Sequence, residues 1–420
     1  MLTKGWDTVS LIRQEKINEE LLKSWNGVNS AFNYSIGENT GEVKGHFAPW
    51  QVVNGGGGRL LRMEFPISDG EMIMNGASYD ISGLTAVVDL TLTLIPDPET
   101  TDKFILKNQY AHFTKDESEI PDDNEGWIHP VTLIGDTSKL GAYAEVILDS
   151  ICYYLLANPN QIIFTFAEIS LAKTGCPDWL RPQSVKYAYL DTGYLCILAV
   201  CDDRGTAGLP LDVDVSGLAS ISDSYFIISP KLLLTNVILP CVCELYDDAS
   251  LSDFTITETG FYNNCELDME EIKSGAIYYT PVVYSGKNIG AIEGSYIRID
   301  YKGYCDMYAG ITMYWNGYVK MEVSLADDGT IYFKKIDDDF DHDEDIPWYL
   351  KWLSLVVMAI TEIVVAIISD DLIDKIADQG ASISADGINT VEWFGETEKV
   401  NNAYLNESLI LQYKIVSNDL

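Results

Sequence analysis

The sequence predicts an α+β protein built from two modules, each a strongly curved antiparallel sheet wrapped around long helices. Long runs alternate between apolar and polar side chains, which is typical of antiparallel strands with one buried face. A few other segments place apolar residues three and four positions apart, as amphipathic helices do. The order helix, several strands, helix occurs within residues 5–171 and again within residues 225–420.

The strands are indicated by a period of two in hydrophobicity. Residues 84–94 alternate aliphatic side chains with threonine and aspartate, and residues 61–67 and 319–325 repeat the pattern. Asp-Asp-Gly at 327–329 predicts a hairpin turn that leads from the last run into another strand. We expect each run to bury one face and expose the other.

Helices are indicated by a spacing of three and four. Residues 139–157 show it most clearly, and Asn158-Pro159 ends the pattern. We expect this helix and a helix over residues 5–26 to pack inside the curved sheet of the first module. Further helices are expected over about 230–243 and, the longest in the chain, over 348–377.

The apolar run at residues 352–369 is compatible with a membrane span or with a buried helix. Its length is close to the minimum for a bilayer. Glu362 lies in the middle of the run, however, and Asp370 and Asp371 follow it. A carboxylate at mid-bilayer costs about 3 kcal/mol or more. We therefore favour a helix that is apolar all round because a sheet encloses it, and we do not expect an integral membrane protein.

The chain length favours about two domains, since single cores rarely grow this large. We place a first module at residues 1–210 and a second at 211–420. Residues 9–21 and 226–239 open the two halves with similar apolar spacing, which hints at a duplication.

The charge balance excludes several partners. The chain has 27 Lys and Arg against 64 Asp and Glu, a formal net charge of −37. Such a charge repels the phosphates of nucleic acids and opposes adsorption to anionic lipid. The eight cysteines lack zinc-site spacing and are predicted to be buried free thiols.

No motif indicates catalysis, and we expect the protein not to be an enzyme. The four histidines are not part of a metalloprotease or nucleophile motif. The sequence NGGGG at 54–58 lacks the Lys-Ser/Thr of a phosphate-binding loop and precedes a strand. It is predicted to be a turn that requires positive φ angles.

The acidic run at 337–345 is the one candidate metal site. The carboxylates of Asp339, Asp341 and Asp343 suit Ca²⁺, although the glycine and glutamate of an EF-hand are missing. The alternative is a solvated acidic loop ahead of the longest helix. A Ca²⁺ ion held there would let so acidic a protein bridge to a membrane.

Several motifs resemble the clostridial P-47 and OrfX proteins, which are encoded beside botulinum-type toxins. The resemblance is densest over residues 1–100 and rests elsewhere on element order and length. Its motifs are Gly5-Trp6-Asp7 leading into a helix with Ile17, Leu21 and Trp25, then Trp50 with Asn54-Gly55-Gly56, then Ile81-Ser82-Gly83 before a long strand.

That resemblance implies the tubular lipid-binding (TULIP) fold, in a two-module arrangement similar to the bactericidal/permeability-increasing protein. It implies a non-enzymatic accessory protein that binds lipid-like ligands such as phospholipid, partner proteins of a toxin complex, or both. A lipid would need a gap lined by Leu90, Leu92, Ile147, Leu148 and Ile151. If helix and sheet meet tightly, the same residues form a closed core, and the protein is purely a protein–protein scaffold.

The N-terminus lacks the basic and apolar regions of a secretory signal peptide. We therefore expect synthesis in the cytoplasm. If the protein acts outside the cell, we expect it to leave by another route together with a toxin complex.

Overall fold

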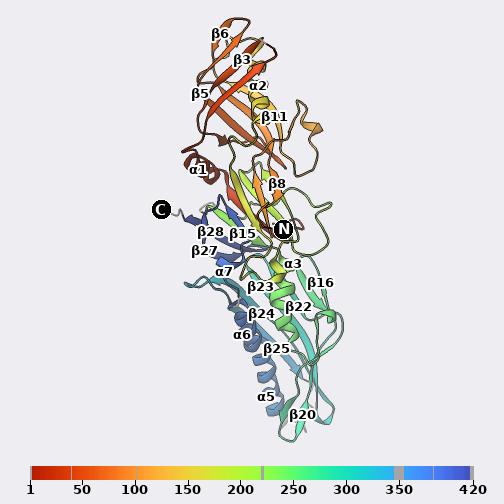
Figure 1. Ribbon diagram of the computed structural model, residues 1–420. Coiled ribbons are helices and arrows are strands. Elements are labelled where there is room, and N and C mark those ends of the chain that lie inside the picture. The colour runs from red at the N-terminus through yellow and green to blue at the C-terminus, as the bar shows by residue number, and fades with distance from the viewer. Residues whose placement is uncertain are drawn as a thin grey trace.

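The computed structural model describes residues 2–38, 40–100, 102–218, 222–344, 354–381 and 383–416. It is an elongated α+β molecule dominated by sheets, as the sequence predicts (Figure 1). A curled N-terminal sheet occupies one end and a second large sheet with the longest helix occupies the other. A central sheet lies between them.

The N-terminal sheet curls around helix α2 (Tyr143–Ala157), in agreement with the predicted helix at 139–157. Its strands run in the order β10-β11-β7-β5-β3-β2, with β4 and β6 also paired to β5. The sheet must be curled, because α2 contacts both of its edge strands, β10 and β2. Tyr153 lies against Phe113 of β10, with ring centroids 4.6 Å apart, and against Tyr34 of β2 at 5.9 Å. The strand bounds are β2 (Ala31–Ile36), β3 (Gly41–Phe47), β4 (Gln51–Val52), β5 (Leu60–Met74), β6 (Ala77–Asp80), β7 (Thr85–Thr91), β10 (His112–Phe113) and β11 (Trp127–Ile134).

Six strands form the central sheet in the order β13-β14-β1-β15-β28-β27, and every neighbouring pair is antiparallel. Half of the strands lie within residues 8–200 and half within residues 224–416. The predicted module boundary at 210/211 falls in the loop between β14 and β15, and the division into modules stays a prediction. The bounds are β1 (Thr8–Arg13), β13 (Ser184–Leu190), β14 (Tyr194–Val200), β15 (Ser224–Ile228), β27 (Thr397–Leu405) and β28 (Leu409–Val416).

A small sheet, β26-β12-β9-β8, flanks the central one and also combines distant segments. Strand β26 from the C-terminal part pairs with β12 through Ala167 and Trp393. Trp393 is fully buried and belongs to the same apolar cluster as the buried residues of α2, so this pairing joins a C-terminal segment to the core of the N-terminal sheet. The bounds are β8 (Thr93–Pro96), β9 (Lys103–Lys107), β12 (Thr165–Ser170) and β26 (Val391–Trp393).

The C-terminal sheet has the order β16-β17-β22-β23-β21-β18, with β24 paired to β23 and β25. The expected turn at 327–329 joins β24 to β25, as predicted. The predicted helix at 230–243 is present as α3, the π-helical turn η3 and α4. The bounds are β16 (Phe254–Ile256), β17 (Gly260–Asn263), β18 (Leu267–Asp268), β19 (Ile272–Ser274), β20 (Ile277–Tyr279), β21 (Pro281–Val283), β22 (Ile289–Glu293), β23 (Tyr296–Met307), β24 (Ile311–Leu325), β25 (Ile331–Glu344), α3 (Pro230–Leu233), η3 (Leu234–Ile238), α4 (Leu239–Cys243) and α7 (Ala385–Ile388).

The opening segment differs from the predicted helix over residues 5–26. Thr8–Arg13 forms strand β1, and only Gln14–Ser24 forms helix α1. Strand β1 pairs on both sides and buries every residue except Arg13, so sheet pairing outweighs the local helical spacing. Helix α1 packs against β1 and β4 at the side of the curled sheet and not inside it (Figure 1).

The run at 84–94 was predicted to expose its polar face, and that expectation is wrong. Asp89 and Thr91 are both buried. Arg62 on the neighbouring strand binds Asp89 through two hydrogen bonds of 2.7 Å. The hydroxyl of Thr91 donates to the carbonyl of Glu125, and it accepts the backbone N–H of Trp127, both at 2.8 Å. A covering loop and an ion pair therefore compensate the buried polar groups.

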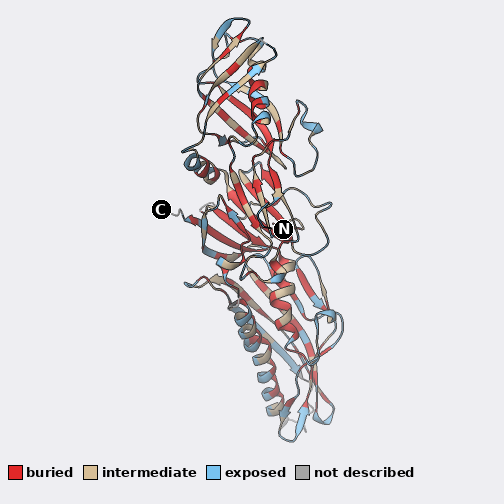
Figure 2. Cartoon of the chain, viewed as in Figure 1, coloured by how far each residue is buried: buried red, intermediate tan, exposed pale blue. Residues whose placement is uncertain are grey.

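The longest helix is not enclosed by sheet, so the expectation that a sheet surrounds residues 352–369 is wrong. Its described part comprises α5 (Ser354–Val365), the π-helical segment η7 (Ala366–Asp371) and α6 (Leu372–Ala381); the predicted start at 348 lies outside the described residues. One side packs on the C-terminal sheet, whereas the other side carries exposed residues (Figure 2). Leu355 is 72% exposed. None of the helices within the described ranges combines the length and apolar character needed to cross a membrane.

Replacing Ile151 of α2 with aspartate should destabilise the fold by about 3 kcal/mol or more, because the site is fully buried and offers a charge no partner. Urea unfolding measures the change. Leu22→Asp on α1 is the matched control, since Leu22 is 59% exposed and should tolerate the charge. Equal stability of the two variants would contradict the packing of α2 inside the curled sheet.

Candidate functional site

The residues predicted to line a lipid gap lie in the core. Leu90 belongs to β7, Leu92 directly follows it, and the other three belong to α2. All are fully buried except Leu148, which is 6% exposed. They share one continuous apolar cluster, in which Trp50 and Phe65 lie with ring centroids 4.1 Å apart. The structure thus brings Leu90, Leu92, Ile147, Leu148 and Ile151 into the same core, and their lipid-binding role stays a prediction.

The candidate metal residues lie on a strand and not on the expected acidic loop. Asp339, Asp341 and Asp343 occupy alternate positions of β25, so they share one face of it. The run is extended because β24 provides a backbone partner along its whole length. In the part of the chain that the structure describes, no group of three His, Cys, Asp or Glu residues has the geometry to hold a metal ion. Binding of Ca²⁺ by these carboxylates stays a prediction.

The Gly-Trp-Asp motif anchors the first central strand. Gly5 has a φ of +96°, which favours glycine. The indole N–H of Trp6 donates to the carbonyl of Pro210 at 2.8 Å. Asp7 accepts the backbone N–H of Cys201 at 2.8 Å and forms an ion pair of 2.7 Å with Arg204. Burial raises the pKa of Asp7, and these two partners oppose that shift. The motif is structural, because it ties the start of β1 to the end of β14.

The NGGGG sequence is a turn with positive φ, as predicted, and it has a packing role. Gly55 has a φ of +118°, and a side chain there would collide with the guanidinium of Arg62, which binds Asp89. The carbonyl of Gly58 accepts the backbone N–H of Tyr189 at 2.6 Å. This turn therefore connects the N-terminal sheet to strand β13 of the central sheet.

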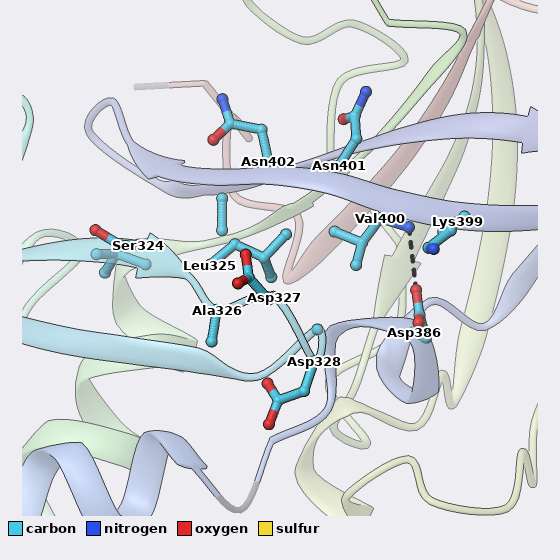
Figure 3. Close-up of a pocket in the computed structure, with 13 residues that line it drawn as sticks. Ser324, Leu325, Ala326, Asp327, Asp328, Asp386, Lys399, Val400, Asn401 and Asn402 are labelled. Atoms are coloured by element: carbon cyan, nitrogen blue, oxygen red, sulfur yellow. Dashed lines mark hydrogen bonds between the residues drawn. The ribbon is translucent and has the colours of Figure 1, made fainter.

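A cavity lies where the C-terminal sheet meets the central sheet, and the sequence reasoning missed it. It measures about 720 Å³. The turn between β24 and β25 supplies Asp327 and Asp328, and strand β27 supplies Lys399 and Asn401 (Figure 3). Asp386, at the wall, accepts the backbone N–H of Val400 at 3.0 Å. The lining can bind a polar ligand through carboxylates, amides and an ammonium group.

A second cavity of about 540 Å³ shares Asp386 and Lys399 with the first and contains Glu398. The carboxylate of Glu398 accepts hydrogen bonds from the hydroxyl of Ser224 and, at 2.7 Å, from the side-chain amide of Asn389. Burial raises the pKa of Glu398 to about 7. No motif signals this network, because its members come from positions far apart in the sequence.

Replacing Glu398 with glutamine should reduce the pH dependence of stability. In the folded state the pKa is about 7 against an ordinary 4.5, so the folded protein binds this proton more tightly than the unfolded chain. The resulting stabilisation is complete below about pH 4.5 and is lost as pH rises through about 7; it amounts to at most about 3 kcal/mol.

Urea unfolding of both proteins at about pH 5 and about pH 8 measures this difference, because subtraction removes the other titrating groups. Glu258→Gln, at an exposed carboxylate in the turn between β16 and β17, is the control and should keep the wild-type pH dependence. Parallel pH profiles for wild type and Glu398→Gln would show that the buried carboxylate is not protonated near neutral pH.

Comparison with known proteins gives one consistent result. Residues 3–391 match the OrfX-like family, described as Protein OrfX2/OrfX3/P47. Protein P47 of Clostridium botulinum (strain Kyoto / Type A2) is 26% identical over 319 residues, which is 72% of each chain. The solved structure of P47 from Clostridium botulinum A2 has a TM-score of 0.73 at 21% identity and covers 98% of both chains. P47 of Clostridium botulinum E1 gives the same TM-score at 20% identity over 99% of this chain and 100% of that one. The chain therefore belongs to the OrfX-like family of P47, OrfX2 and OrfX3 proteins.

Proposed function

We propose that this chain is a non-enzymatic accessory protein of an OrfX-type toxin gene cluster, and that it acts by binding other proteins of that cluster. Family membership supports the association with such a cluster. The observation that carries protein binding over lipid binding is the burial of the residues that would line a lipid gap. Their side chains are at most 6% exposed and belong to a continuous core. With these side chains packed in the core, we propose that binding takes place at the surface of the protein.

We also propose that the fold consists of two TULIP-like modules. The strand order of the central sheet supports this. One half of the sheet is β1 with the hairpin β13–β14, and the other is β15 with the hairpin β28–β27. Each half thus combines an opening strand, which leads into a helix, with a closing hairpin. A duplicated module would produce this arrangement.

Native mass spectrometry of the purified full-length chain tests the absence of an internal lipid. We expect a single species at the mass of the polypeptide, 46.8 kDa, with no bound acyl chain. Denaturing mass spectrometry of the same sample provides the reference mass. A stoichiometric acyl ligand that leaves on denaturation would contradict the closed core and favour lipid binding.

Co-expression with OrfX-type proteins of the proposed gene cluster tests partner binding. We expect at least one of them to elute with this chain as a complex of defined stoichiometry in size-exclusion chromatography. The Ile151→Asp variant is a control for folding, because complexes should be lost with its core. Separate elution of every pair and of the full set would contradict the proposal.

A further inference from the structure

The longest helix has an outer face with two chemically distinct parts. In α5 the buried residues are Val357, Ile360, Thr361 and Val364, which leaves the opposite side in solvent. On that outer side Leu355 is 72% exposed, Met358 53% and Ile363 40%. Glu362 is the one charged residue of this stretch, between apolar neighbours. We name the outer face of Ser354–Ala366 the apolar segment.

Beyond the apolar segment the outer face becomes acidic. Asp371, Asp374 and Asp378 are exposed, and none forms an ion pair with the described residues. Asp370 is different, because it pairs with Lys335 at 2.8 Å. We name Asp371, Asp374 and Asp378 the acidic segment.

The acidic segment lies beside further negative charge. Helix α6 packs on β25, which carries the acidic run 337–344. Lys335 binds both Asp338 and Asp370, so one lysine is shared between the strand and the helix. Asp337 pairs with Lys320 at 2.9 Å, whereas Asp339, Asp341 and Asp343 of β25 form no ion pair with any residue that the structure describes. The helix therefore presents an apolar segment next to a surface with excess negative charge.

We propose that this outer face binds a protein partner through an amphipathic helical segment whose apolar side chains are flanked by Lys or Arg. The apolar segment would bury the partner's apolar side chains, and the acidic segment would pair with its cations. This inference rests on the proposed function and specifies which surface and which partner chemistry serve it.

Charge complementarity decides between the alternatives. A second copy of this chain would bring the same carboxylates to the interface, and like charges oppose that contact. An anionic membrane is repelled in the same way. Only a partner with cations around an apolar stripe satisfies both parts of the face.

The test uses the full-length chain and three designed helical peptides of equal length. The first has a leucine stripe flanked by lysines, the second replaces the leucines with serine, and the third replaces the lysines with glutamate. We expect the leucine–lysine peptide to bind at least about tenfold more tightly than either of the others, because each of those lacks one half of the complementarity. Fluorescence anisotropy of labelled peptides measures the affinities.

Two variants localise the binding. Leu355→Asp should lower the affinity for the leucine–lysine peptide about tenfold. Leu22→Asp, the same substitution at an exposed leucine of α1, should leave this affinity unchanged. Replacing both Asp374 and Asp378 with lysine should lower the affinity for this peptide by a similar factor. Asp203→Lys, in an exposed loop, should leave the affinity unchanged. Hydrogen exchange gives an independent readout, since the peptide should protect α5 amides in the wild type.

Several outcomes would overturn the proposal. One is equal affinity of the wild type and Leu355→Asp for the leucine–lysine peptide. Another is flotation with phosphatidylcholine vesicles that Leu355→Asp abolishes, which would assign the face to a membrane. A third is self-association, in sedimentation, that the same variant abolishes. If cluster proteins bind the Leu355→Asp variant normally, the outer face of α5 is not their binding surface, while the proposed function stands. If the peptide binds this face but no cluster protein forms a complex with the chain, the surface assignment stands and the proposed function is wrong.

Discussion

The pairing of β1 with β15 is the interaction on which the rest of the structure depends. These two strands lie at the middle of the central sheet, with Thr8 opposite Ile228 and Ile12 opposite Ser224. Strand β1 joins the hairpin β13–β14 to the sheet, and β15 joins the hairpin β27–β28. Segments from the start, middle and end of the chain therefore share one hydrogen-bonded unit. Asp7 fixes the end of this strand pair. Its side chain binds Arg204, and its backbone carbonyl accepts the N–H of Ser229.

Each outer sheet is attached to this unit by specific hydrogen bonds. On the N-terminal side, the hydroxyl of Tyr187 accepts the N–H of Leu92 at 2.7 Å and donates to the carbonyl of Arg59 at 3.1 Å. On the C-terminal side, the hydroxyl of Tyr413 donates to the carbonyl of Ala385 in α7 at 2.7 Å, beside the second cavity. The N–H of Ala385 in turn donates to the carbonyl of Gly329, in the turn between β24 and β25, at 3.0 Å. Both tyrosines are almost fully buried, so the attachments are protected from water. The outer face of α5 is thus held at one end of an elongated and continuous molecule (Figure 1).

Local patterns predicted the elements whose environment follows from their own sequence. The helix at 139–157 and the hairpin at 327–329 are examples, since spacing and turn residues suffice for them. Strand β1 was missed because its pairing with β14 and β15 is non-local. The acidic run was predicted to be a loop because its strand character comes from β24 and not from its own residues. The network around Glu398 was not predicted, because it joins Ser224 and Asn389 from separate elements. The exposed apolar face of α5 was not predicted either, because composition does not distinguish an exposed apolar face from a buried one.

Native-state hydrogen exchange of the central strands tests most directly whether the two halves form one cooperative unit. Val9 of β1 faces Ile227 of β15 across the middle of the sheet, and both are fully buried. If the shared sheet makes the halves inseparable, amides of β1 and β15 should exchange only through global opening and give the same free energy. Amides of β15 that open at a free energy lower than those of β1 by more than about 1 kcal/mol would show that the halves unfold separately, and would contradict this account.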